Sequence, residues 1–129
     1  MTGLKAGVIG AGWFGEIHCN VIAGVPGLEL AALADRDAAR LEEIGRQYGI
    51  ASLHTDYRDL LADPAIDLVH IVTRWDSHAE IAVAALAAGK HVLLEKPMAP
   101  TVAECEQICQ AARDADTYLM VGHVCRFNP

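Results

Sequence analysis

The sequence has no long uncharged apolar stretch, although 53% of its 129 residues are hydrophobic. Its longest apolar segment is interrupted at Gly89 and Lys90, so it falls short of the roughly 20 residues that cross a bilayer. The N-terminal apolar segment is too short for a secretory signal, which also needs a basic start and a cleavage site. We therefore expect a cytoplasmic protein with no membrane partner.

Positive charge is scarce as well. Ten Lys and Arg residues face 17 Asp and Glu residues, which gives a formal net charge of −7 at pH 7. This excess of negative charge argues against nucleic acid and against an anionic membrane surface as partners. The length suits one domain that buries a sheet beneath helices on both faces.

Cysteine and histidine show no spacing that is typical of a metal site. The four cysteines are Cys19, Cys105, Cys109 and Cys125, and without a secretory signal we expect reduced thiols. Cys105 and Cys109 lie one helical turn apart, which leaves a metal site as an alternative to two small buried hydrophobic side chains. No second cysteine pair or suitably spaced histidine accompanies them, and structural roles are expected for His54, His70, His91 and His123.

A glycine motif follows the first predicted strand. Residues 4–9 form a short apolar run, and Gly10-Ala11-Gly12-Trp13-Phe14-Gly15 comes next, with a helical pattern to about Ala23. In a dinucleotide-binding unit the first glycine permits a tight turn, the second leaves room for the pyrophosphate, and the third lets helix and strand pack closely. The phosphates are then expected on backbone N–H groups near Trp13 and Phe14.

An acidic residue stands where such a unit places one. The apolar run 28–34 ends at Asp35, which is 20 residues after Gly15, the spacing at which a carboxylate meets the adenosine ribose hydroxyls. The alternative role for Asp35 is a helix N-cap, because residues 37–47 look helical. Asp35 favours NAD, whereas the adjacent Arg36 leaves NADP possible, since a guanidinium can hold a 2′-phosphate.

The rest of the chain alternates between strand and helix patterns. Further strands are expected at 51–55, 68–72, 91–94 and 118–121. Further helices are expected at 57–62 behind Asp56, through Ala88 behind Asp76 or Ser77, and after Thr101, where Glu104 completes a capping-box pattern. The alternation predicts an α/β fold, a doubly wound, mainly parallel Rossmann sheet of six strands in the order 3-2-1-4-5-6.

Several segments together resemble the glucose–fructose oxidoreductase / inositol dehydrogenase (Gfo/Idh/MocA) family. They are the glycine motif extended to His18, Asp67-Leu68-Val69, Ser77-His78-Ala79-Glu80, Gly89 through Glu95-Lys96-Pro97, and Gly122 through Pro129. The resemblance runs from residue 4 to residue 129. It implies an enzyme that transfers hydride between NAD or NADP and a sugar, cyclitol or related secondary alcohol.

The resemblance also implies roles for individual residues. Lys96 is expected to be catalytic and to manage the hydroxyl proton, while Pro97 fixes the backbone after it, through a bond that is often cis in the family. Glu95 is expected to orient Lys96 or the nicotinamide ribose, or else to form a strand-end ion pair. His78 matches a position close to the cofactor, or is a plain helix-start histidine.

Other positions are less determined by the resemblance. Thr73, expected near the cofactor, begins Thr73-Arg74-Trp75, which departs from the usual Thr-Pro-Asn of the family. His18 is expected to pack or hydrogen-bond locally on its helix. Arg126 is expected either to reach substrate or nicotinamide or to form an interdomain ion pair.

The family continues with a second α+β domain, which covers the nicotinamide, supplies an Asp and a His, and often forms the oligomer interface. The resemblance therefore implies that residues 1–129 are the dinucleotide-binding domain of a fragment or truncated gene product, inactive alone, with the substrate domain missing and a homo-oligomeric parent. A non-catalytic dinucleotide-sensing module of the same family is the alternative, although it has no need of Lys96. An S-adenosylmethionine site is weaker still, because Gly15 and Lys96 count against it.

Overall fold

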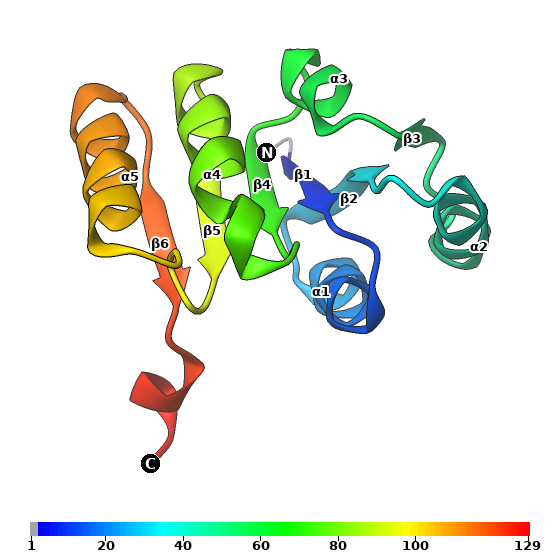
Figure 1. The fold of residues 1–129 in the computed structure, drawn as a ribbon. Coiled ribbons are helices and arrows are strands. Elements are labelled where there is room, and N and C mark those ends of the chain that lie inside the picture. The colour runs from blue at the N-terminus through cyan, green and yellow to red at the C-terminus, as the bar shows by residue number, and fades with distance from the viewer. Residues whose placement is uncertain (1–2) are drawn as a thin grey trace.

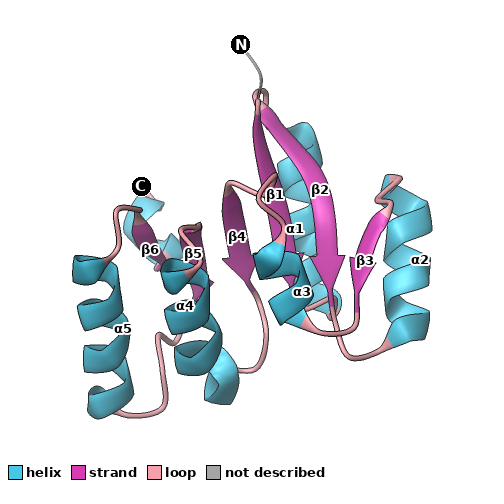
Figure 2. Ribbon diagram, turned by 90° about the horizontal axis from the view of Figure 1, so that it is seen from above, coloured by secondary structure: helices cyan, strands magenta, loops and turns pink. Residues whose placement is uncertain are grey.

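Six parallel strands form one sheet in the computed structural model, which describes residues 3–129 (Figures 1 and 2). The strands are β1 (Leu4–Ile9), β2 (Leu28–Ala34), β3 (Ser52–His54), β4 (Leu68–Ile71), β5 (His91–Glu95) and β6 (Leu119–Gly122). Their order is β3-β2-β1-β4-β5-β6, and every neighbouring pair is parallel. This confirms the predicted fold class and strand order, and no strand end differs from its prediction by more than one residue.

Helices cover the sheet from two sides. They are α1 (Trp13–Gly24), α2 (Ala38–Tyr48), α3 (Tyr57–Ala62), α4 (His78–Ala87) and α5 (Val102–Asp114), with 3₁₀ turns at Trp75–Ser77 and Val124–Phe127. Figure 1 shows α3, α4 and α5 along one face and α1 on the other. The arrangement follows from right-handed crossovers, which change sides when the strand order reverses between β3 and β4.

Successive residues along a strand pack into two separate hydrophobic cores, one on each face of the sheet. Val8 packs with Cys19 and Ile22 of α1 and with Ile44 of α2, whereas Ile9 packs in the cluster beneath α3, α4 and α5. Each fully buried Ile or Leu contributes about 1.5–3 kcal/mol relative to an exposed one. Burial on both faces explains why the strands are almost continuously apolar.

Three helices begin at polar N-cap residues, at the positions where the sequence predicts a helix to begin. The Asp37 carboxylate accepts from Arg40 N–H at the start of α2, and Asp56 accepts from Arg58 N–H at the start of α3. The hydroxyl of Thr101 accepts from Glu104 N–H at 3.2 Å and begins α5. The helix at residue 37 is therefore capped by Asp37, and the alternative that Asp35 caps it is wrong.

The start of α4 differs from the prediction. Ser77 occupies the N-cap position, but neither it nor Asp76 caps the helix through its side chain, because a 3₁₀ turn precedes α4. The Ser77 Oγ instead lies 2.8 Å from both Thr73 Oγ1 and Arg74 O. These contacts stabilise the loop after β4 rather than the helix end.

The sheet edge near β6 is covered on one face only. Val92 and Leu94 of β5 are buried beneath α4 and α5, while Leu93 points to the other face beside Met120 of β6, which is 49% exposed. Among the described residues no helix lies against that face of β5 and β6 (Figure 1). Glu95, at the end of β5, lies on the same side, and there His18 of α1 reaches it at 3.1 Å and the Glu95 side chain is only 14% exposed.

Gly15→Ala is expected to lower the free energy of unfolding by about 1–3 kcal/mol or more, because a Cβ at this position would lie 1.8 Å from the Gly10 carbonyl oxygen. The matched control is Gly24→Ala at the other end of α1, where a Cβ meets nothing within 4 Å. The control is expected to be neutral or stabilising by up to ~1 kcal/mol. Urea unfolding of both variants measures the difference, and equal midpoints would contradict this account of Gly15.

Candidate cofactor and catalytic site

The glycine loop is closed by backbone contacts at its two ends. Gly10 has φ +106°, and a Cβ there would lie 2.6 Å from Val72 O. Its N–H donates to Ala34 O at 2.8 Å, which ties the loop to the end of β2. Gly15 lies against the Gly10 carbonyl oxygen. Both positions exclude a side chain for reasons internal to the fold.

Gly12 is different, because a Cβ there would meet nothing within 4 Å. Its φ of −66° and ψ of −174° are open to any residue. Gly12 is also the N-cap of α1 and offers no side-chain cap, so the N–H groups of Trp13 and Phe14 have no acceptor within the helix. The positive end of a 12-residue helix therefore faces open space, which suits an anion.

Asp35 fastens the same loop. Its Oδ2 accepts from Ala11 N–H at 2.7 Å, and its Oδ1 accepts from Asp37 N–H at 2.8 Å. Each carboxylate oxygen keeps a second lone pair for a hydroxyl donor. Asp35 thus couples the carboxyl end of β2 to the phosphate-binding geometry and remains able to accept from a ribose.

Arg40 completes this arrangement and was missed from the sequence. Its Nε donates to Ala11 O at 2.9 Å, while its Nη2 donates to Glu16 at 2.6 Å. The Ala11 residue is therefore held at its N–H by Asp35 and at its carbonyl by Arg40. The pairing of Arg40 with Glu43 has a helical spacing visible in the sequence, but the contacts to Ala11 and Glu16 depend on folding.

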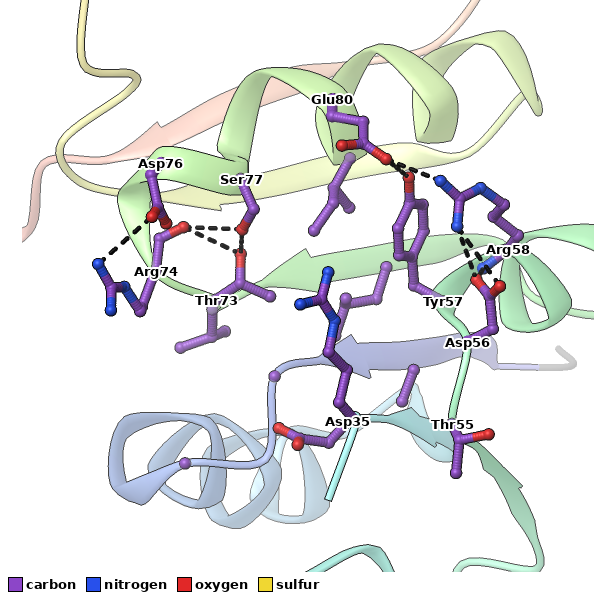
Figure 3. Close-up of a pocket in the computed structure, with 17 residues that line it drawn as sticks. Asp35, Thr55, Asp56, Tyr57, Arg58, Thr73, Arg74, Asp76, Ser77 and Glu80 are labelled. Atoms are coloured by element: carbon purple, nitrogen blue, oxygen red, sulfur yellow. Dashed lines mark hydrogen bonds and ion pairs between the residues drawn. The ribbon is translucent and has the colours of Figure 1, made fainter. Parts of the chain in front are cut away.

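A cavity of about 750 Å³ opens at the carboxyl ends of β1, β2 and β4 (Figure 3). Five of the predicted cofactor residues line it, namely Gly10, Gly12, Asp35, Arg36 and Thr73. The other predicted cofactor residues, Trp13, Phe14, Gly15, His78, Glu95 and Pro97, do not line this cavity. Its position agrees with the rule that open α/β sheets bind ligands where the strand order reverses.

One wall of the cavity carries a cluster that sequence analysis did not single out. Tyr57 O–H donates to Glu80 at 2.7 Å, and Arg58 pairs with Glu80 at 2.8 Å and with Asp56 at 3.3 Å (Figure 3). Burial and the Glu80 carboxylate raise the pKa of Tyr57 to about 12, so its hydroxyl stays a donor at neutral pH. Asp56, Tyr57 and Arg58 are consecutive at the start of α3, but no sequence pattern links them to Glu80, which lies on α4.

His78 lies behind two loops. It is 1% exposed, with Nδ1 2.8 Å from Pro97 O and Nε2 3.1 Å from Thr73 O. It therefore connects the loop after β4 to the turn after β5. This is more than the role of a plain helix-start histidine, and proximity to the cofactor stays a prediction.

Lys96 lies beside a second cavity, of about 590 Å³, which is also lined by Pro97 and residues 123–126. The Lys96–Pro97 bond is cis. The Lys96 side chain is exposed, and within residues 3–129 it takes part in no ion pair. Arg126 lines the same cavity, so the fold brings both cations to the end of β5.

His18 packs on its own helix as expected, because its ring centroid lies 5.2 Å from that of Phe14, and it also makes contacts beyond the helix. Its Nε2 lies 3.1 Å from Glu95 Oε1, and its Nδ1 lies 2.9 Å from His70 Nδ1. Glu95 Oε2 accepts from Lys96 N–H at 3.1 Å. Burial and the facing His18 lower the pKa of His70 to about 4.

The cysteines are free thiols, but Cys105 and Cys109 are half-buried rather than buried as expected. Burial raises the pKa of the Cys19 thiol to about 11, which leaves it protonated. Within residues 3–129 no group of three or more His, Cys, Asp or Glu side chains is arranged to hold a metal ion. No helix in this part of the chain has the length and apolar character needed to span a membrane.

The parallel sheet, the uncapped glycine loop and the carboxylate at the end of β2 define a dinucleotide-binding Rossmann domain. A family described as "Oxidoreductase family, NAD-binding Rossmann fold" matches residues 4–123. The chain belongs to this family, Gfo/Idh/MocA.

Relatives and solved structures agree with this assignment. The chain is 35% identical to 4-carboxy-2-hydroxymuconate-6-semialdehyde dehydrogenase of Sphingobium over 98% of its length and 40% of that protein. It is 36% identical to inositol 2-dehydrogenase of Salmonella typhimurium over 97% of its length and 38% of that protein. Scyllo-inositol dehydrogenase of Lactobacillus casei, solved with bound NAD(H) and scyllo-inositol, is similar with TM-score 0.93 and 30% identity over 98% of this chain and 38% of that one. The chain thus spans about two fifths of the length of these relatives.

Gly12→Val is expected to abolish binding of NAD in calorimetric titration, because its methyl groups occupy the space at the start of α1 where the pyrophosphate fits. The extended backbone of Gly12 accepts valine, so the variant is expected to fold. Gly24→Val, at the other end of the same helix and in equally open surroundings, is the control and should retain binding. Undiminished NAD affinity of Gly12→Val would remove the glycine loop from the cofactor site.

Proposed function

We propose that the chain binds NAD as the cofactor-binding part of an oxidoreductase that moves hydride between nicotinamide and a sugar, cyclitol or related secondary alcohol. The observation that carries the proposal is the uncapped start of α1, which faces open space at Gly12 beside the Asp35 carboxylate. A pyrophosphate accepts hydrogen bonds from those free N–H groups, and a ribose hydroxyl donates to Asp35. The 750 Å³ cavity has room for the adenosine half.

The residues at the end of β5 supply the chemistry. NAD bound in the cavity supplies the hydride acceptor, and oxidation of the alcohol breaks its carbinol C–H bond and releases the hydroxyl proton. Lys96 stands at the second cavity with its ammonium in no ion pair, so it can hydrogen-bond the hydroxyl oxygen and exchange its proton. His78 holds the Pro97 carbonyl against the loop at Thr73, which fixes the distance between the two cavities.

The charges that line the cavity favour binding of NAD over binding of NADP. Four carboxylates line it, from Asp35, Asp56, Asp76 and Glu80, and repel an added phosphate. Of the three arginines in the lining, Arg58 is engaged by Asp56 and Glu80, and Arg74 pairs with Asp76 at 3.3 Å. Arg36 forms no ion pair within the described residues and is the competing influence. A cytoplasmic location and a homo-oligomeric intact protein belong to the same proposal.

Asp35→Ser is expected to narrow or invert the preference for NAD over NADP, because it removes the charge that repels a 2′-phosphate. The ratio of the two dissociation constants is the readout, because loss of the Asp35 bond to Ala11 N–H weakens both cofactors alike. Arg36→Ala is the companion variant and should weaken NADP more than NAD. Tighter binding of NADP by the unmodified chain would show that Arg36 sets the choice.

Lys96→Met in the intact protein is expected to lower the rate of alcohol oxidation about a hundredfold or more, with NAD affinity nearly unchanged. Methionine keeps the length of the side chain and removes its exchangeable protons. Steady-state rates and NAD titration measure the two effects separately. Unaltered turnover would remove Lys96 from the mechanism, whereas absence of turnover in the unmodified intact protein would favour a dinucleotide-sensing role.

A further inference from the structure

Three ionisable side chains from three different elements meet behind Lys96. His18 of α1 lies between His70 of β4 and Glu95 of β5, at 2.9 Å and 3.1 Å. The side chains of His18 and Glu95 are only 11% and 14% exposed. Leaving one of these buried polar groups without a hydrogen-bond partner is costly, so each side chain is expected to keep the contact that it makes here.

The direction of these hydrogen bonds follows from what each group can do. A carboxylate only accepts, so His18 Nε2 carries a proton and donates to Glu95 Oε1. In a neutral His18 the Nδ1 then accepts, and His70 Nδ1 must donate to it. Burial holds the pKa of His70 at about 4, so His70 is neutral at physiological pH and suits this role.

Glu95, which is held by His18, in turn hydrogen-bonds the backbone of Lys96. Its Oε2 accepts from the Lys96 N–H at 3.1 Å, at the point where the Lys96 side chain leaves the backbone. Gly122 lies beside Glu95 in the sheet register, and a Cβ at that position would be 3.2 Å from Glu95 Oε1. The carboxylate is therefore confined between α1, β6 and the Lys96 backbone.

We propose that His18 is a positioning residue for Lys96: it holds the Glu95 carboxylate on the backbone of the Lys96–Pro97 turn and away from the Lys96 ammonium. The proposal rests on the proposed role of Lys96 in catalysis. Released from His18, Glu95 can turn toward the adjacent ammonium, and an ion pair there would hold the proton on Lys96 and draw it from the alcohol. His70 acts behind His18 by fixing the nitrogen that donates.

The groups that face His18 are few. His70 approaches from β4 and Glu95 from β5, and the ring centroid of Phe14, on the same helix, lies 5.2 Å from that of His18. Glu16 is two residues earlier on α1, points to another side of the helix, and is engaged by Arg40. A change in the titration of Lys96 after substitution of His18 therefore has Glu95 as its source.

The test follows the Lys96 titration by NMR of the side-chain ¹³Cε signal in the 129-residue chain. His18→Leu is expected to move the titration midpoint upward by about half a pH unit or more, as an added carboxylate favours the charged amine. His18→Gln should restore the original midpoint, because its amide donates to Glu95 and accepts from His70. Adding Glu95→Gln to His18→Leu should cancel the shift, and His91→Gln, at the other end of β5, is the histidine control.

A folded His18→Leu chain with an unchanged Lys96 titration overturns the proposal, as does a shift that persists in the Glu95→Gln background. The unmodified chain gives a second, independent check, because long-range ¹⁵N–¹H spectra at pH 7.5 should show the Nε2–H tautomer for His18 and Nδ1–H for His70. The opposite tautomers contradict the proposal even if a variant does not fold. Neither measurement involves turnover, so failure of the catalytic role of Lys96 is recognised separately by the Lys96→Met rates.

Discussion

The approach of Gly15 to the carbonyl oxygen of Gly10 is the contact on which the rest of this site depends. It brings the first turn of α1 against the end of β1, so that the free N–H groups at the start of the helix lie next to Gly12, which lines the cavity. No side chain fits at position 15, because its Cβ would lie 1.8 Å from the Gly10 carbonyl oxygen. The absence of a side chain at Gly15 therefore allows the start of α1, which can bind an anion, to lie at a fixed distance from β2 and β4.

Charge then determines what the cavity can accept. The residue Ala11 is held at both of its polar groups, by Asp35 and Arg40, so the loop is already arranged before a ligand arrives. Preorganisation of this kind reduces the ordering cost of binding. The acidic lining repels negative charge, whereas the free N–H groups at the start of α1 attract it.

The two cavities are joined by buried histidines rather than by the apolar core. His78 spans the loops after β4 and β5, and His18 spans α1 and the end of β5. Imidazole suits this purpose because it has hydrogen-bonding nitrogens on opposite sides of a rigid ring. These histidines connect the elements that carry Lys96 and the glycine loop, and neither of them lines either cavity.

The sequence by itself determined the strand order and the places of the glycine loop and of Asp35, because these depend on periodicity and on spacing within short segments, whereas Glu95-Lys96-Pro97 was singled out only by the resemblance to the family. It did not reveal Arg40 as the partner of Ala11, the Tyr57–Glu80 wall or the histidine pair behind Glu95. It also misplaced the cap of α4, which a 3₁₀ turn preceded, and it did not reveal that His18 reaches Glu95 in addition to packing on its own helix. Only the tertiary structure decided the long-range contacts, because the fold brings together residues that are 23 to 77 positions apart, and no local pattern records which of them will meet.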